Sequence, residues 1–331
     1  MGEYELTRAV WAVDRSVFPA DGSLADKLRF LLRYAILAPS SHNSQPWRFA
    51  VRPDGVNVFA EESRWLPEAD PTKRELYVSV GCAVENLCVS AEAFGFRARV
   101  DRRPDGPGDL AARVTVDDAA PDSRRPPGLF DHVTDRYTSH APFADRPLPD
   151  EAVTAFRDAT PDGVALEFVT DAARTDALAA LQVEADEALM DDPAYRRELA
   201  HWVGLGALGD SWLAARVGQT VLTHLDLGPR EARKNAELLR GASAIGVLAT
   251  PSDDGNAWLE TGQAYERLAL QAAGRGIAVH PVSQTLERLD TRRRLGDLLD
   301  VDGYPQHLFR LGYDDGPAEH TPRWPLEKFL A

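Results

Sequence analysis

The sequence predicts an α+β chain made of two related halves, in which helices pack around mainly antiparallel sheets. Three observations predict this architecture: a repeated helical stretch, a strand-like stretch before each copy, and a loop-rich segment between the copies. The repeat relates residues 81–96, GCAVENLCVSAEAFGF, to residues 262–277, GQAYERLALQAAGRGI, at a constant offset. Six positions are identical in register, and a glycine ends each copy as it would end a helix. We therefore expect an internal duplication, with chance similarity between two Ala/Leu-rich helices as the alternative.

The elements expected in the first half follow from the spacing of apolar residues and from turn signals. They are a helix over residues 23–36, a hairpin with strands at 47–51 and 56–60, a helix over 74–94 and a strand at 110–116. Ser23 is a suitable N-cap for the first helix, and Pro39 ends it. Clusters of Pro, Gly and Asp near residues 117–128 read as a linker. We therefore divide the chain into residues 1–125 and 126–331.

The elements expected in the second half repeat this plan with additions. They are a helix over 149–159, a strand at 164–170, helical patterns through 174–240, a strand at 244–249, the repeated helix, a strand-like stretch at 277–284, a helix over 286–299 and a strand at 307–313. Residues 190–240 have no counterpart in the first half. Their apolar residues among glycines suggest a helical lid, with an ordinary packed helical pair as the alternative; they are Trp202, Leu205, Leu208, Trp212 and Leu213.

The composition limits the class of protein. Hydrophobic residues make up 44% of 331 residues, enough for a large core, and no apolar run is long enough to cross a bilayer. A net charge of −15 opposes binding to nucleic acid and to anionic membranes. The N-terminus begins acidic without an apolar signal core, and the only cysteines, Cys82 and Cys88, are badly placed to bridge each other. We expect a reduced, cytoplasmic setting.

The stretch APSSHNSQPW, residues 38–47, concentrates short hydrogen-bonding side chains at one bend between a helix and a strand. A surface turn needs fewer of them. The stretch resembles the flavin-contact loop of the nitroreductase family, whose members are homodimers that hold FMN between subunits. The second half contains RYTSHAPF at 136–143, HPVSQ at 280–284 and PRWP around Arg323, which resemble the segments that the other subunit supplies. With the duplication, the chain resembles the fused, single-chain, Acg-like branch of that family.

The resemblance implies a set of cofactor-binding residues, and the chemistry of each fits. The flat ring of FMN needs short donors and acceptors at its edge, and the phosphate needs cations with a forked geometry. The flavin-edge loop supplies Pro39, Ser40, Ser41, Asn43 and Gln45; the phosphate contacts are Arg136, Arg323 and the hydroxyl of Thr138; and the backbone near flavin N5 includes Pro281, Ser283 and Gln284.

His140 departs from the family pattern. The family usually has Lys or Arg near flavin N1 and O2, where it stabilises the anionic reduced form, and His140 takes that place here. If His140 carries this charge, the charge depends on pH near neutrality. The alternative is a structural histidine.

Only one of the two flavin sites expected in a fused dimer is complete. The second half reads RDATPDGVALEF where the loop of residues 38–47 should recur. In the first half, only Arg15, Ser16 and Phe18 remain of the phosphate segment. The two decayed parts belong to the same site. We expect one FMN per chain and a monomer, because the usual dimer lies within one chain.

Two functions share this site. The first is an oxidoreductase in which a hydride passes from NAD(P)H to FMN and then to an electron-poor small molecule, with no catalytic side chain needed from the protein. The alternative is a non-catalytic FMN-binding protein for flavin storage, sequestration or redox sensing. The eight histidines show no metal-binding spacing, so no metal site is predicted.

Overall fold

The structure is a computed structural model that describes residues 6–103, 106, 108–121, 124–207, 228–316 and 319–331. Each half contains one four-stranded antiparallel sheet. The first sheet has the order β1-β2-β4-β3, with β1 (Trp47–Arg52), β2 (Gly55–Ala60), β3 (Arg97–Arg102) and β4 (Leu110–Asp117). The second has the order β5-β6-β8-β7, with β5 (Ala165–Val169), β6 (Ala244–Thr250), β7 (Ala278–Pro281) and β8 (Tyr304–Gly312). The identical strand order confirms the α+β duplication.

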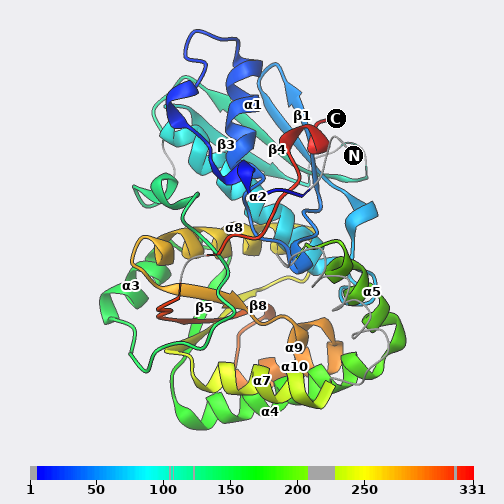
Figure 1. Cartoon of the computed structure of the whole chain (residues 1–331). Coiled ribbons are helices and arrows are strands. Elements are labelled where there is room, and N and C mark those ends of the chain that lie inside the picture. The colour runs from blue at the N-terminus through cyan, green and yellow to red at the C-terminus, as the bar shows by residue number, and fades with distance from the viewer. Residues whose placement is uncertain (1–5, 104–105, 107, 122–123, 208–227, 317–318) are drawn as a thin grey trace.

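The repeated helices α2 (Arg74–Ala93) and α8 (Gly255–Ala273) pack against each other between the two sheets (Figure 1). Gly81 and Gly262 let the two backbones approach, because a Cβ on Gly262 would lie 2.9 Å from the Cα of Gly81. Both copies end in the expected glycine, Gly95 with φ 88° and Gly276 with φ 65°. The duplication therefore places the two copies in one shared core rather than in separate domains.

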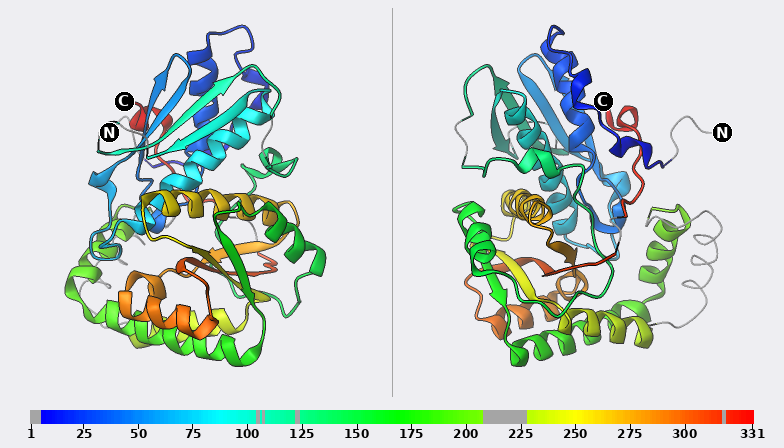
Figure 2. Two further views of the ribbon diagram at one scale, coloured as in Figure 1. Left: turned by 180° about the vertical axis from the view of Figure 1, so that it is seen from behind. Right: turned by 60° about the vertical axis from the view of Figure 1, so that its left-hand side comes forward.

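The remaining helices cover the sheets and the junction between the halves. The α-helices are α1 (Leu24–Ala35), α3 (Asp150–Ala159), α4 (Ala172–Asp191), α5 (Pro193–Gly204), α7 (Gly228–Arg240), α9 (Gln284–Glu287) and α10 (Leu289–Leu299). The 3-10 turns are η1 (Ala9–Trp11), η2 (Arg15–Val17), η3 (Ser41–Asn43), η4 (Glu62–Arg64), η5 (Leu129–His132) and η6 (Leu326–Phe329). In Figures 1 and 2, α4 and α7 lie below the second sheet, and α5 stands beside the junction of the halves.

Most expected elements are present, with two differences. The sequence does not predict the edge strand β3, RARVDR, because its outward side chains are charged and Ala98 is its one buried residue. The helix expected over 286–299 is split into α9 and α10 at Arg288, whose φ of −105° and ψ of 130° are extended. Leu208, Trp212 and Leu213 of the suggested lid lie outside the described residues. No helix in the described part of the chain is long and apolar enough to span a membrane.

The C-terminal segment returns to the first half. Thr7 pairs with Arg323 in an antiparallel bridge, and the ring of Phe329 lies 6.1 Å from that of Trp47. The N–H of Ala331 donates to the carbonyl of Phe49 at 2.8 Å. This return carries Arg323 to the loop of residues 38–47, from which it is far apart in sequence.

Candidate functional site

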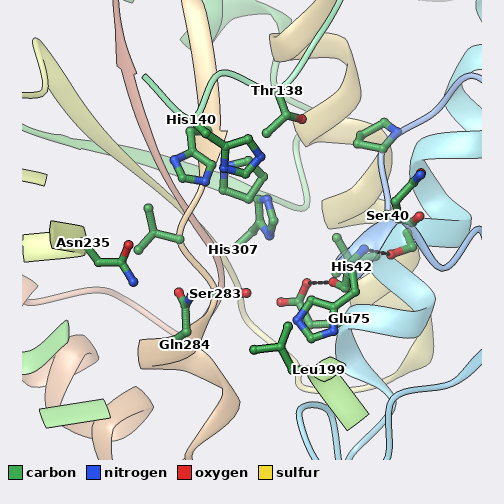
Figure 3. A pocket seen from close by; sticks show the side chains of 18 of the residues that line it. Ser40, His42, Glu75, Thr138, His140, Leu199, Asn235, Ser283, Gln284 and His307 are labelled. Atoms are coloured by element: carbon green, nitrogen blue, oxygen red, sulfur yellow. Dashed lines mark hydrogen bonds between the residues drawn. The ribbon is translucent and has the colours of Figure 1, made fainter. Parts of the chain in front are cut away.

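A cavity of about 440 Å³ lies at the junction of the two halves, within the size range of small-molecule sites. The structure brings to its wall most of the residues predicted to bind a cofactor: Pro39, Ser40, Ser41, Asn43, Thr138, His140, Pro281, Ser283, Gln284 and Arg323. Figure 3 shows Ser40 and Thr138 on one side, with Ser283 and Gln284 opposite. Segments from both halves therefore meet at this cavity.

The loop of residues 38–47 uses unusual backbone geometry to reach the cavity. His42, Asn43 and Gln45 have φ values of 49°, 53° and 51°, in the left-handed region that few side chains adopt. Hydrogen bonds hold this shape: the N–H of Gln45 donates to Ser40 Oγ at 2.9 Å, and Ser41 Oγ donates to Glu75 Oε2 at 2.9 Å. Several of the polar side chains in this loop are therefore needed to hold a strained backbone.

Asn43 joins three parts of the chain. Its Nδ2 donates to the carbonyl of Ala207 at 2.7 Å, after α5, and to the carbonyl of Pro322 at 2.8 Å. Its Oδ1 is buried without a hydrogen-bond partner among the described residues. Only the acceptor side of this amide is therefore available to a ligand.

Gln45 and Arg136, both predicted cofactor contacts, lie outside the cavity wall. Gln45 is fully buried; its Nε2 donates to the carbonyl of Asn43, and its Oε1 accepts the N–H of Trp324 at 3.0 Å. Arg136 donates to the carbonyl of Leu37 at 2.8 Å, and its Nε lies 3.2 Å from Glu266 Oε1. In this structure both side chains hold the protein itself together.

Arg323 lines the cavity from the C-terminal segment. Its Nη2 donates to the carbonyl of Ala38 at 3.1 Å, while its buried Nε has no hydrogen-bond partner among the described residues. Burial, and then the neighbouring charge of Arg136, lower the pKa of Arg323 to about 9. Two guanidinium groups near one wall favour an anion there.

Arg310 on β8 is a wall residue that the sequence did not reveal. It is fully buried, its Nε donates to His280 Nδ1 at 3.0 Å, and its Nη2 donates to the carbonyl of Ala141 at 2.9 Å. Its Nη1 has no hydrogen-bond partner among the described residues. The only signal was a lone arginine inside the strand HLFRLGY, where a buried charge requires a partner.

His140 retains exposed surface on the cavity wall, and its ring lies 4.5 Å from that of His280. The protein packed around its imidazole, and then the charges of Arg310 and Lys234, lower the pKa of His140 below its usual value. A positive charge on His140 near neutral pH is therefore disfavoured.

Two further histidines, His42 and His307, lie near Glu75 on the cavity wall (Figure 3). Burial lowers the pKa of both histidines to about 4, so they are neutral at pH 7. Neither ring nitrogen of His307 has a hydrogen-bond partner among the described residues. Burial by itself would raise the pKa of Glu75, but its ion pair with Arg74 at 2.7 Å helps to lower it.

Leu189 and the insertion of residues 190–240 contribute an apolar part of the wall. The residues are Leu189 and Met190 from α4, Tyr195, Leu199 and Val203 from α5, and Leu238 from α7. Asn235 of α7 also faces the cavity and donates to Asp186 Oδ2 at 2.9 Å (Figure 3). Within the described ranges, no group of three or more His, Cys, Asp or Glu side chains could hold a metal ion. The cavity thus combines one apolar side with polar edges.

Comparisons with known proteins extend over most of the chain. No family model matches it. A Mycobacterium tuberculosis protein provisionally named an NAD(P)H nitroreductase is 31% identical over 323 residues, covering 92% of this chain and 91% of the relative. Another, provisionally named the NAD(P)H nitroreductase acg, is 27% identical over 316 residues, covering 92% and 95%.

Solved structures with a similar backbone arrangement match a smaller part of this chain. The FMN-dependent nitroreductase NfnB from Mycobacterium smegmatis, in complex with NADPH, is 23% identical with a TM-score of 0.42. It matches 58% of this chain and 92% of its own. The FMN- and NADPH-dependent NfnB of a Sphingopyxis strain is 16% identical with a TM-score of 0.45, matching 62% and 98%.

Proposed function

The chain belongs to the nitroreductase family, and on that premise we propose that it is an FMN-binding oxidoreductase that takes electrons from NAD(P)H and passes them to an electron-poor small molecule. One observation carries this proposal. The cavity between the halves has two buried guanidinium groups on its wall, Arg310 and Arg323, and each has one N–H without a hydrogen-bond partner among the described residues. Such donors favour a ligand with negative or electron-rich ends.

The segment around Thr138 supports an elongated ligand. Thr138 pairs with Val279 in a parallel bridge, so the chain is extended there. Arg136 and His140 lie two residues to either side, and a fully extended chain, at about 3.3 Å per residue, would hold them roughly 13 Å apart. Thr138 and His140 line the cavity, and Arg136 lies just behind its wall, beside Arg323. One end of the segment is thus suited to an anion, and the other end to a polar ring edge.

The residues fit FMN. Arg323 would hold the phosphate, with the hydroxyl of Thr138 as a further donor. Ser40, Ser283 and Gln284 offer short polar groups to the edge of the ring. The apolar side chains of α4 and α5 would cover one face of the ring and exclude water. This combination of apolar surface and few polar groups is typical of a cofactor site.

Bound FMN would supply the two-electron transfer itself, and the protein would supply binding, orientation and electrostatics. The neutral imidazoles of His42 and His307 would offer hydrogen bonds to an uncharged acceptor without adding positive charge. Neutral imidazole can polarise a carbonyl group in this way. We therefore favour a planar acceptor with oxygen substituents, such as a quinone or a nitro compound.

We also propose that the protein acts as a monomer in a reducing compartment. The packing of α2 on α8 supports a monomer, because the second half takes the place of a partner subunit. Both cysteines are free and buried, which is compatible with a reducing compartment. Light scattering of the purified protein should give the mass of one chain; a dimer mass would contradict this proposal.

The first experiment is an anaerobic titration. The protein is purified, its FMN content is measured from the flavin absorbance, and NADPH and then NADH are added. Rapid bleaching would support the oxidoreductase. Bound FMN that only dithionite reduces would favour storage or sensing. A protein that takes up no FMN would overturn the proposal.

A further inference from the structure

We infer that Arg310, rather than His140, supplies the positive charge that the protein places against the pyrimidine edge of bound FMN. This inference rests on the proposed function and names one of its determinants. It starts from a buried charge without a charged partner. Arg310 is fully buried, and a guanidinium remains protonated at any physiological pH.

The hydrogen bonds of Arg310 go to neutral acceptors. They are His280 Nδ1 and the carbonyl oxygens of Ser139 and Ala141. The acid that influences it, Asp314, is half-buried and is engaged elsewhere, since it accepts Ser139 Oγ at 2.5 Å and the N–H of Gly316 at 2.8 Å. The ring of Phe143 lies over the guanidinium of Arg310, 4.0 Å from its central carbon, and covers one face. Nη1 remains without a hydrogen-bond partner among the described residues, and a buried donor of a charged group is costly unless an acceptor faces it.

The neighbouring histidines do not carry this charge. His280 accepts a hydrogen bond at Nδ1 from Arg310, so its imidazole is the neutral form with its proton on Nε2. The protein packed around His140, and then the charges of Arg310 and Lys234, oppose its protonation. Arg310 therefore supplies the permanent cation of this group, and His140 remains a neutral donor or acceptor.

The position of Arg310 identifies the part of the ligand that it meets. Its carbonyl acceptors, Ser139 and Ala141, flank His140, and its backbone pairs with that of His280, immediately before Pro281. Arg323 lies beside Arg136, at the end of residues 136–140 that is away from His140. If Arg323 holds the phosphate, Arg310 lies toward the ring. The pyrimidine edge of a flavin gains negative charge on two-electron reduction, and a fixed cation there favours the reduced form.

The test compares four variants with the FMN-loaded wild type: Arg310→Gln, Arg310→Lys, His140→Gln and Arg323→Gln. The midpoint potential is measured by equilibration with a reference dye, and the affinities of the apoprotein for FMN and riboflavin are measured by flavin fluorescence. Riboflavin lacks the phosphate, so comparing the two ligands separates the two ends of the site.

We expect Arg310→Gln to weaken binding of reduced relative to oxidised FMN about tenfold, which lowers the potential by about 30 mV for a two-electron couple. It should weaken FMN and riboflavin binding by similar factors. Arg310→Lys should retain most of the potential, and His140→Gln should leave it unchanged. Arg323→Gln should weaken FMN about tenfold or more without affecting riboflavin or the potential.

An unchanged potential in Arg310→Gln, or a drop of similar size in His140→Gln, would overturn the inference about Arg310. Neither result would contradict the proposal that the protein binds FMN. If Arg310→Gln does not fold, Arg310→Lys and His140→Gln decide: a wild-type potential in both supports Arg310, and a fall in His140→Gln alone overturns it. A wild-type protein that binds neither flavin would overturn the proposed function together with this inference.

Discussion

Glu85 of α2 and Glu266 of α8 occupy equivalent positions in the two halves, but their electrostatic surroundings are opposite. Glu85 Oε1 accepts hydrogen bonds from Arg125 and Arg267, each at 2.8 Å. Burial would raise the pKa of Glu85, but these two guanidiniums lower it to about 2. Burial raises the pKa of Glu266 to about 7, although Arg136 opposes this rise. Arg125 lies in the segment that joins the two halves. This segment therefore places a guanidinium against Glu85 that Glu266 does not have.

This contrast predicts unequal effects of the same substitution. Glu85→Gln should lower the free energy of unfolding at pH 7 by about 3–5 kcal/mol, because it leaves two buried guanidiniums without their anion. Glu266→Gln should cost less than Glu85→Gln, because near pH 7 the native carboxyl is close to half protonated and the substitution leaves one buried guanidinium, that of Arg136, without its anion rather than two. Urea unfolding of both variants measures this.

The pH dependence provides a control for the Glu85 prediction. The folded pKa of Glu85 is depressed, so its contribution to stability is present above about pH 4.5 and is lost as the pH falls toward 2. The deficit of Glu85→Gln should shrink over that range. Equal losses at pH 7 for the two glutamates would contradict the assigned environments.

The contact between Gly81 and Gly262 predicts that even one methyl group is too large there. A Cβ on Gly81 would lie 3.0 Å from Gly262 Cα and would overlap the carbonyl oxygen of Leu259. Gly81→Ala should therefore destabilise the protein by about 1–3 kcal/mol. Gly296→Ala in α10 is the matched control, because its Cβ would meet Pro305 at an ordinary 3.5 Å. It should be neutral or stabilising by up to about 1 kcal/mol. Thermal unfolding of both variants tests the pair, and a stabilised Gly81→Ala would show that the helices can separate freely.

The buried carboxyl of Asp70 should make the protein less stable as the pH rises toward neutrality. Its carboxyl is buried, and that burial raises its pKa to about 7 although Arg74 opposes the rise. Because the folded pKa exceeds the usual value, the stabilising contribution is complete below about pH 4 and is lost as the pH rises through 7. Asp70→Asn should remove this dependence, of the order of 1 kcal/mol per pH unit. Its amide oxygen can still accept the N–H of Leu76. Parallel urea curves from pH 5 to 8 for both proteins would contradict the assignment.

The hydrogen bonds of Glu198 should limit how easily a reductant reaches the cavity. From α5, its carboxylate accepts the N–H groups of Glu68 at 3.1 Å and Ala69 at 2.9 Å, and so ties α5 to the first half. Its side chain does not line the cavity, whereas Leu199 does. In the FMN-loaded protein, Glu198→Ala should loosen this cover and speed flavin reduction by dithionite several-fold. Glu187→Ala on the exposed face of α4 is the control. Equal rates for the wild type and both variants would show that α5 does not limit access.

Local patterns were sufficient for the elements whose signals are local. Ser23 does cap α1, in a capping box with Asp26, and the hairpin of β1 and β2 turns where RPDG predicts. Strand β3 escaped detection because its pairing with β4 compensates for its weak apolar pattern. The duplication was readable because identical residues recur in register.

The wall of the site was only partly predictable. Pro39 and Ser40 stand in a loop of unusual composition, and they line the cavity as expected. Arg310 stands in a strand where a lone arginine is its only signal, and Asn235 stands in a helix whose local sequence is ordinary. The resemblance also points to Gln45 and Arg136, whose side chains bind backbone groups behind the wall in this structure.

The sequence by itself determined the α+β architecture, the duplication and the loop at residues 38–47, because helix periodicity, glycine ends and turn residues act over short distances. Only the tertiary structure decided the charges at the cavity. The pKa values of His140 and Glu266 and the unsatisfied donor of Arg310 depend on burial and on groups far away in sequence. Electrostatic energy depends on distance and on local dielectric, and the linear order of residues specifies neither.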